Sequence, residues 1–236
     1  MDHYDGHRQQ IVAACRVLVE HGYLTATGGN VSLRVAGQDA FAITPSNFDY
    51  DRMTAGDVCV LDFDLAPLAG EHKPSVESGM HAAVYRTRPD VQAVVHTHQP
   101  YASALALVDA PIPALFDEQA RFLGRSVEII PYAPSGTGFL RNKIVKSIKN
   151  NHNAYIIQNH GVLCFGHDLE RAVHNVELLE KCSLAYLLAL CTEREVSKIP
   201  LVVREIAFAK LRQDQKKQAR REAARATQHD DGGTHG

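Results

Sequence analysis

The sequence predicts one α/β domain in which helices cover the faces of a mostly antiparallel sheet. Stretches of alternating apolar residues, typical of strands, interchange irregularly with stretches of helical periodicity. Short polar turns join neighbouring strand segments as hairpins, and hairpins connect antiparallel strands. A chain of 236 residues with 45% hydrophobic residues is long enough to bury one sizeable core, with two domains as the upper limit.

Helices are predicted where apolar residues recur every three or four positions, or where a capping residue precedes such a run. Ile11 and Leu18 lie on the apolar face of the first helix. Ser75 is the N-cap candidate of another helix, whose first turn contains Glu77. Pro200 ends the longest helix, and an amphipathic segment follows it. The predicted helices span 6–22, 73–88, 100–108, 135–150, 168–193 and 201–211.

Strands are predicted where apolar residues alternate with polar ones or form short runs between turn residues. Gly37-Gln38-Asp39 is the turn of a hairpin, and Pro45 ends its second strand. The predicted strands span 31–35, 40–44, 58–63, 91–98, 113–116, 126–132, 154–158 and 162–165.

Composition restricts the function classes. The net charge of −2 gives the whole chain no electrostatic attraction to nucleic acid or membrane. The five cysteines are odd in number and contain no CxxC pair, which favours buried thiols in a reducing compartment. No apolar run is long enough to cross a bilayer, and the N-terminus is polar and acidic. We therefore expect a cytoplasmic protein that binds a small molecule, with neither nucleic acid nor membrane as a partner.

The C-terminal segment differs from the rest in charge. Residues 204–225 contain eight basic and three acidic residues, so they carry +5, and the remainder carries −7 within the total of −2. Such a segment could contact RNA or a membrane, but it lacks interleaved aromatics and a strong apolar face. We predict a basic helical tail over 201–226, solvated beyond 211 or used as an interface element, and a disordered end over 227–236.

The strongest candidate for chemistry is the strand that ends in His96-Thr97-His98. Side chains alternate along a strand, so His96 and His98 point to one face. Catalytic zinc sites typically use three protein ligands, and His160 could supply the third from a turn in which Gly161 allows close approach. An ordinary strand whose imidazoles are satisfied by hydrogen bonds is the alternative that this spacing leaves open.

Other polar residues could support such a site. Glu77 could act as a general acid and base beside a metal, although a first-turn acid favoured by the helix dipole would look the same. His81, one turn later, shares its face and suits a supporting or packing role. The loops at 27–30, 44–47 and 74–75 offer hydroxyl, amide and N–H groups that suit anions, and plain turn chemistry also explains them.

Together and in this order, five short motifs resemble the class II aldolase/adducin family, and the resemblance covers about residues 5–195. The motifs are Thr27-Gly28-Gly29-Asn30-Val31-Ser32, Ile43-Thr44-Pro45-Ser46, Lys73-Pro74-Ser75-Val76-Glu77, Val94-Val95-His96-Thr97-His98 and Asn159-His160-Gly161. The resemblance implies a three-layer α/β/α fold with a central, mostly antiparallel sheet, and a catalytic domain over 1–200. It also implies a homotetramer with active sites between subunits.

The resemblance further implies a divalent metal, most often Zn²⁺, with Mn²⁺ or Co²⁺ in some relatives. It assigns roles to nine residues of this chain. These are His96, His98 and His160 as metal ligands, Glu77 as the acid and base, Asn30, Ser46 and Ser75 at the anionic end of the substrate, and Thr27 and Asn47 nearby.

The implied activity is that of a metal-dependent lyase that cleaves a C–C bond through a metal-stabilised enediolate. An aldolase acting on a small hydroxylated ketone or sugar phosphate is the first expectation. A decarboxylase of a hydroxy-aromatic or 3-keto acid is the alternative, and a 4-epimerase or a non-catalytic, adducin-like scaffold is weaker. Three departures from the motifs of sugar-phosphate aldolases bear on this choice: Val76 replaces a serine, Asn47 a glycine, and Asp117, followed by Glu118, a tyrosine.

Overall fold

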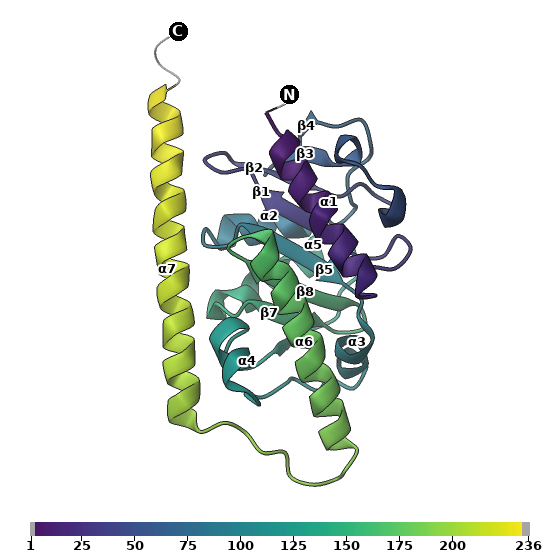
Figure 1. Ribbon diagram of the computed structural model, residues 1–236, viewed down its shortest axis with the longest axis vertical. Helices are drawn as coiled ribbons and strands as arrows, with labels where there is room; N and C mark the ends of the chain where they lie inside the picture. The colour runs from purple at the N-terminus through teal and green to yellow at the C-terminus, as the bar shows by residue number, and fades with distance from the viewer. Residues whose placement is uncertain (1–2, 233–236) are drawn as a thin grey trace.

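An eight-stranded sheet forms the centre of the part of the protein that the structure describes (Figure 1). The computed structural model describes residues 3–232, with side chains to Arg225. The strand order is β4-β3-β2-β1-β5-β8-β7-β6, and only the β6–β7 pair is parallel. The strands are β1 Asn30–Arg34, β2 Ala40–Ile43, β3 Cys59–Asp62, β4 Pro67–Ala69, β5 Ala93–Thr97, β6 Glu128–Ile130, β7 Ala154–Ile157 and β8 Gly161–Gly166.

Helices cover both faces of the sheet, so the predicted three-layer α/β/α class is confirmed. One apolar core joins the sheet to α1, α3 and α6, and a second core joins its other face to α2 and α5. All residues of β1 and β5 are buried, which is expected when helices cover both faces. The helices are α1 Asp5–Glu20, α2 Ser78–Thr87, α3 Pro100–Leu107, α4 Asp117–Phe122, α5 Gly138–Ser147, α6 Leu169–Leu190 and α7 Leu201–Gly232.

The sheet register brings the histidine motifs to one edge. In the antiparallel pair of β1 and β5, Asn30 at the start of one strand lies opposite His96 near the end of the other. In the pair of β5 and β8, Thr97 lies opposite Val162, directly after the turn that carries His160. Segments that are distant in sequence therefore meet where β5 ends.

Two local predictions are wrong. The helix predicted over 73–88 begins only at Ser78, so Glu77 is its N-cap and the Ser75 hydroxyl instead accepts the N–H of Glu77 at 3.2 Å. Residues 113–116 form no strand, because the Gln119 side chain of α4 bonds to backbone groups of this segment. The sequence reasoning also missed α4 and β4.

The C-terminal helix packs against the body of the protein. Beyond 211 most of the described residues are exposed, as predicted for a solvated helix, but Gln215 and Glu222 are buried, as are Phe208 and Leu211 before them. The helix α7 lies beside α4 and runs to Gly232, beyond the predicted end at 226 (Figure 1). The rest of the predicted disordered end, 233–236, lies outside the described residues.

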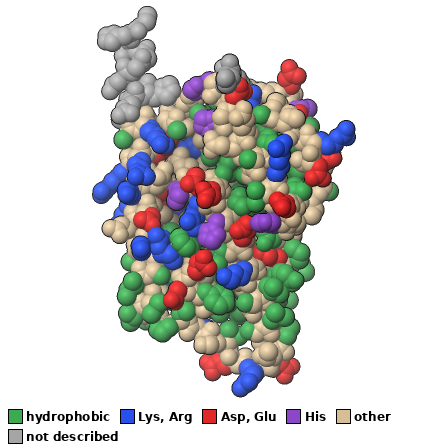
Figure 2. All heavy atoms as spheres, viewed as in Figure 1, with side chains coloured by type: hydrophobic (Ala, Val, Ile, Leu, Met, Phe, Trp, Pro, Cys, Tyr) green, Lys and Arg blue, Asp and Glu red, His purple; other side chains and the backbone are tan. Residues whose placement is uncertain are grey.

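Most basic side chains of α7 are exposed. Figure 2 shows Lys and Arg side chains along this side of the molecule. The exposed cations among the described side chains of the helix are Lys210, Lys216, Lys217, Arg220, Arg221 and Arg225. Within residues 3–232, no helix combines the length and the apolar character that a membrane-spanning segment needs.

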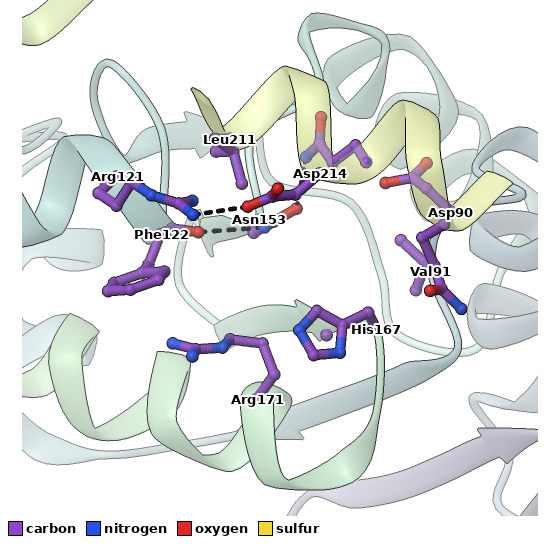
Figure 3. Close-up of a pocket in the computed structure, with 12 residues that line it drawn as sticks. Asp90, Val91, Arg121, Phe122, Asn153, His167, Arg171, Leu211 and Asp214 are labelled. Carbon is purple, nitrogen blue, oxygen red and sulfur yellow. Dashed lines mark hydrogen bonds and ion pairs between the residues drawn. The ribbon is translucent and has the colours of Figure 1, made fainter. Parts of the chain in front are cut away.

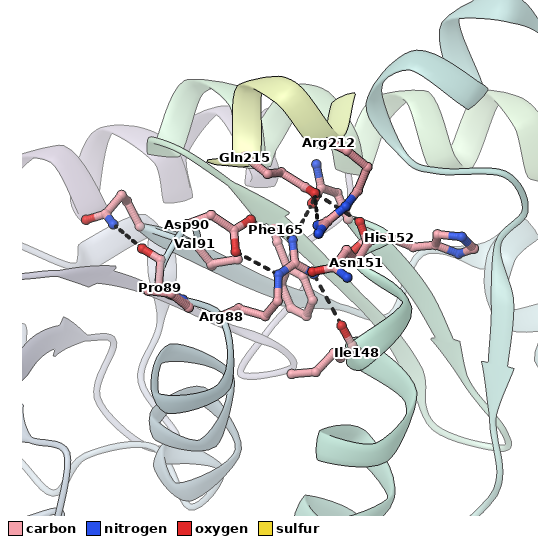
Figure 4. Close-up of polar contacts among 12 residues, drawn as sticks. Arg88, Pro89, Asp90, Val91, Ile148, Asn151, His152, Phe165, Arg212 and Gln215 are labelled. Carbon is pink, nitrogen blue, oxygen red and sulfur yellow. Dashed lines mark hydrogen bonds and ion pairs between the residues drawn. The ribbon is translucent and has the colours of Figure 1, made fainter. Parts of the chain in front are cut away.

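A buried polar network anchors α7 near its middle (Figure 4). The Arg88 guanidinium bonds to both carboxylate oxygens of Asp90 at 2.7 and 2.8 Å, to the His152 carbonyl and to the Asn153 side chain. Gln215 of α7 donates to Asn153 and to the Asn151 carbonyl, each at 2.9 Å. The tail therefore completes a network that begins in the core.

Beside this contact lies a cavity of about 100 Å³ (Figure 3). Arg121 and Asp214, which form an ion pair at 2.5 Å, lie on one side of it, and His167 and Arg171 lie on the other. Arg171 also packs over the Phe122 ring at 4.1 Å. All five cysteines are free, and all but Cys191 are buried, so the prediction of buried thiols holds for four of them.

A candidate metal centre with a carboxylate

Three imidazoles converge at the edge where β5 ends. The ligating atoms of His96, His98 and His160 all lie within 4.8 Å of one another, and the Nε2 atoms of His96 and His98 are 2.9 Å apart. His96 is buried, His160 is half-buried and His98 is exposed, so the cluster is open to solvent on one side. One cation with bonds of about 2.0–2.1 Å could reach all three nitrogens after small side-chain adjustments.

The hydrogen bonds around His96 leave Nε2 available for a cation. A carbonyl oxygen only accepts hydrogen bonds, so Nδ1 of His96 donates to the Val162 carbonyl at 2.8 Å, and the lone pair of the neutral ring lies on Nε2. This partner is typical of metal-binding histidines. His160 Nδ1 is buried and has no hydrogen-bond partner among the described residues. A donor set with such an unsatisfied atom fits a divalent metal.

Burial favours the neutral forms of His96 and His98. It lowers the pKa of His96 to about 4, and the neighbouring His98 and His160 act in the same direction. Burial also lowers the pKa of His98, and the nearby His160 acts in the same direction. A neutral imidazole is the form that binds a metal, so these two rings favour a cation over protons near neutral pH.

Glycines allow the strands and loops to approach the cluster. A Cβ on Gly161 would lie 2.4 Å from the His98 ring and 2.6 Å from the Thr97 carbonyl, which confirms the predicted close approach. Gly29 has φ +84°, and a Cβ there would lie 2.6 Å from the His96 carbonyl. A side chain at either position would displace a ligand-bearing segment.

Glu77 lies between two of the histidines. Its Oε2 is 3.3 Å from His96 Nε2, and its Oε1 is 3.2 Å from His160 Nε2. Asn30 donates to Oε2 at 2.8 Å and Ser135 donates to Oε1 at 2.6 Å. Burial alone raises the pKa of Glu77, but the hydrogen bonds with His160, Ser135 and Asn30 outweigh it and lower the pKa below its usual range. The carboxylate is therefore ionised and held in place.

The loops predicted to bind an anion lie together near this cluster. Ser46 donates its N–H to the Lys73 carbonyl, and Ser75 donates its N–H to Thr44, so the 44–46 and 73–75 loops pair. Thr27 is exposed in a loop that reaches the cluster, since a Cβ on the adjacent Gly28 would lie 3.1 Å from His98 Nδ1. The fold thus places the predicted anion-binding loops beside the histidine cluster.

The structure refines three of the predicted assignments. Asn30 contacts Glu77 directly, an interaction that the sequence did not reveal. Asn47 has φ +55°, a conformation that asparagine tolerates better than most residues, which explains how it can replace glycine. Glu118, beside Asp117, faces Lys181 and His174 of α6.

Sequence reasoning missed Ser135. It lies in the loop before α5, and its hydroxyl contacts Glu77 across 58 positions of sequence. A hydroxyl following a strand that ends at the same sheet edge is the only signal in the sequence, and it is weak without the sheet order. Three imidazoles and a fixed carboxylate at one edge of a three-layer sheet define a candidate metal centre with an acid/base group.

Comparisons with known proteins identify the family that the chain resembles. The family model for the "Class II Aldolase and Adducin N-terminal domain" matches residues 9–187. The chain is 34% identical to 5-deoxy-D-ribulose 1-phosphate aldolase of Bacillus thuringiensis serovar kurstaki, over 76% of this chain and 83% of that protein. It is 33% identical to L-fuculose phosphate aldolase of Escherichia coli strain K12, again over 76% and 83%.

A solved structure of an L-fuculose 1-phosphate aldolase superposes with a TM-score of 0.82 at 31% identity, covering 88% of this chain and 96% of that one. The chain belongs to the class II aldolase and adducin family.

Proposed function

We propose that this protein is a divalent-metal-dependent lyase, an aldolase that cleaves a C–C bond in a small hydroxylated ketone or sugar phosphate. The observation that carries the proposal is the convergence of His96, His98 and His160 within 4.8 Å, with Glu77 beside them. The similarity to two sugar-phosphate aldolases supports this choice over a non-catalytic scaffold, which needs none of these groups.

The histidines would hold the metal, and Glu77 would move the proton. When bound, a divalent metal supplies Lewis-acid stabilisation of the enediolate that C–C cleavage produces. Glu77 has an ionised carboxylate fixed by Asn30 and Ser135, so it is suited to accept a proton from a substrate hydroxyl. The reverse reaction would use the same carboxylate, protonated, as the donor.

The loops beside the histidines would bind the anionic end of the substrate. We assign this role to Asn30, Ser46 and Ser75, with Thr27 and Asn47 nearby, because these loops pair with each other and border the histidine cluster. Backbone N–H groups and hydroxyls in such loops suit phosphate or carboxylate oxygens.

A decarboxylase is the second candidate. Val76, next to Glu77, is 62% exposed and offers no hydrogen bond where sugar-phosphate aldolases usually carry a serine. An apolar group there suits a hydroxy-aromatic or 3-keto acid better than a phosphate. Loss of CO₂ from such an acid leaves an enolate or phenolate, which a metal also stabilises.

A substrate screen with metal analysis tests the proposal. Purified protein loaded with Zn²⁺, Mn²⁺ or Co²⁺ is mixed with ketose 1-phosphates, and aldehyde release is measured. The same protein is mixed with a panel of hydroxy-aromatic and 3-keto acids, and CO₂ release is measured. We expect metal-dependent aldehyde release that a chelator abolishes. CO₂ release alone would support the second candidate. A protein that binds none of these metals and is inactive on both panels would contradict the proposal.

We also propose a homotetramer. Leu107 and Val108, at the end of α3, are 68% and 66% exposed, and contact with a second copy would cover such side chains. The mass in solution, measured by sedimentation, should be that of four chains. A mass of one chain would overturn the proposed tetramer.

A further inference from the structure

A line of buried polar side chains runs from Glu77 into the core, away from the histidine cluster. His81 Nε2 lies 2.5 Å from Asn30 Oδ1, and His81 Nδ1 lies 2.6 Å from Ser32 Oγ. The Ser32 hydroxyl lies 2.7 Å from the hydroxyl of Tyr85. Of these, His81 and Ser32 are fully buried, while Tyr85 is 1% exposed and Asn30 3% exposed.

Two regular elements produce this alignment. Residues Asn30 and Ser32 are two apart on β1, so they share one face of the strand. Residues His81 and Tyr85 are four apart on α2, so they share one face of the helix. Glu77, four residues before His81, continues that face at the N-cap.

The direction of every hydrogen bond in the line follows from its first member. An ionised carboxylate only accepts, so Asn30 donates through Nδ2 and presents Oδ1 to His81. A carbonyl oxygen only accepts as well, so His81 carries its proton on Nε2. Burial lowers the pKa of His81 to about 3, so the ring is neutral and Nδ1 has no proton.

The remaining two bonds are then fixed. The unprotonated Nδ1 of His81 must accept from the Ser32 hydroxyl, which uses the only proton of that hydroxyl. The Tyr85 hydroxyl must therefore donate to Ser32. Phe41 and Phe63 pack around the Tyr85 ring, with centroids 5.6 and 5.9 Å away, and seal this end from solvent.

We infer that His81, Ser32 and Tyr85 are positioning residues that lock the orientation of the Asn30 amide and, through it, the Glu77 carboxylate. This inference rests on the proposed role of Glu77. An amide in the middle of the line does not relay protons, so the line orients groups. With Oδ1 of Asn30 committed to His81, the amide cannot flip and its N–H groups stay directed toward Glu77.

Kinetics of matched variants tests the inference. In the metal-loaded full-length enzyme, His81→Leu should lower kcat by about 10–100-fold, the range for groups that orient catalytic side chains, with a smaller change in KM and unchanged metal content. His81→Gln should recover much of the loss, because its amide can still donate to Asn30. Tyr85→Phe should give a smaller loss than His81→Leu.

The control is Tyr155→Phe. Tyr155 is fully buried in the same core as Tyr85, but its hydroxyl bonds to Asn150 and lies outside the line. Its variant should keep wild-type kcat. Wild-type kcat in both His81→Leu and Tyr85→Phe would overturn the inference, as would equal losses in Tyr85→Phe and Tyr155→Phe.

A spectroscopic measurement needs no substrate and separates this inference from the proposed function. Histidine ¹⁵N NMR should show His81 as the neutral Nε2–H tautomer, with unprotonated Nδ1, in the wild type. Ser32→Ala and Tyr85→Phe should weaken that preference, whereas Tyr155→Phe should not. If His81 shows this tautomer but the enzyme is inactive on every substrate, only the proposed function is refuted. If His81 carries its proton on Nδ1, the proposed hydrogen-bond directions are refuted.

Discussion

The two ends of α2 carry buried charged groups that differ in how completely their surroundings are hydrogen-bonded. At its C-terminal end, the Arg88 guanidinium is surrounded by acceptors, with both Asp90 oxygens, the His152 carbonyl and Asn153 within 3.1 Å. At its N-terminal end, Glu77 faces imidazole nitrogens, and one of those rings, His160, has a buried nitrogen without a partner among the described residues.

This difference separates a structural network from a reactive one. Buried charges that are fully hydrogen-bonded hold elements together, and Arg88 thereby joins α2 to the loop before β7 and, through Asn153, to α7. Buried groups that converge and leave an atom unsatisfied need another component to complete them. We expect substitutions around Arg88 to change stability, and substitutions around Glu77 and the histidines to change metal binding and turnover.

The largest effect is expected for His98→Ala. Removing a ligand should weaken metal affinity by more than about 100-fold, since even the loss of a group behind a ligand costs about 10–100-fold. Turnover should fall to background. Metal content after dialysis and aldehyde release measure both effects. His167→Ala is the control, because His167 is exposed and pairs with Asp168. A His98→Ala protein with full metal content would contradict the ligand assignment.

Glu77→Gln should separate metal binding from chemistry. The amide keeps the shape of the side chain but cannot take a proton, so turnover should fall by about 10²–10⁴-fold. The three histidines remain, so metal content should stay at the wild-type level. Both quantities are measured on one preparation, and a fully active Glu77→Gln enzyme would refute the assigned acid/base role.

Arg88→Met should reduce stability with no change in metal content per folded chain. It leaves the Asp90 carboxylate without its partner in a site where the Arg88 side chain is 2% exposed. Breaking such a buried pair costs about 3–5 kcal/mol in the free energy of unfolding. Arg86→Met is the matched control, because that residue pairs with Asp64 at the surface and should cost about 0–1 kcal/mol. Equal losses in urea unfolding would contradict the structural role assigned to the buried Arg88 network.

The smallest effect is a pH dependence at the structural end. Burial, helped by the charges of Arg125 and Arg88, lowers the pKa of His152 to about 4. The unfolded chain takes up this proton below about pH 6.5 and the folded chain does not, so stability is lost as the pH falls toward 4. His152→Gln should reduce the loss in free energy of unfolding between pH 7 and pH 5 by about 2 kcal/mol. Identical pH profiles for the two proteins would contradict this.

Sequence motifs predicted the candidate site more accurately than they predicted the structure around it. The three histidines and Glu77 lie in short segments of recognisable composition. His98 directly follows β5, and the alternation expected there correctly brought its ring close to that of His96. Ser135 was missed because its contact with Glu77 depends on strand order, which local patterns do not encode. The packing of α7 was missed because Gln215 is polar and buried only through its partners around Arg88. Glu77 was placed two positions too deep in α2 because Ser75 also suits an N-cap.

The most direct test is the position of the metal itself. Crystals of the metal-loaded protein, measured on both sides of the absorption edge of the bound metal, should give one anomalous peak per chain. We predict that this peak lies about 2.0–2.1 Å from nitrogen atoms of His96, His98 and His160. A peak elsewhere, or none in protein shown to contain the metal, would contradict the account.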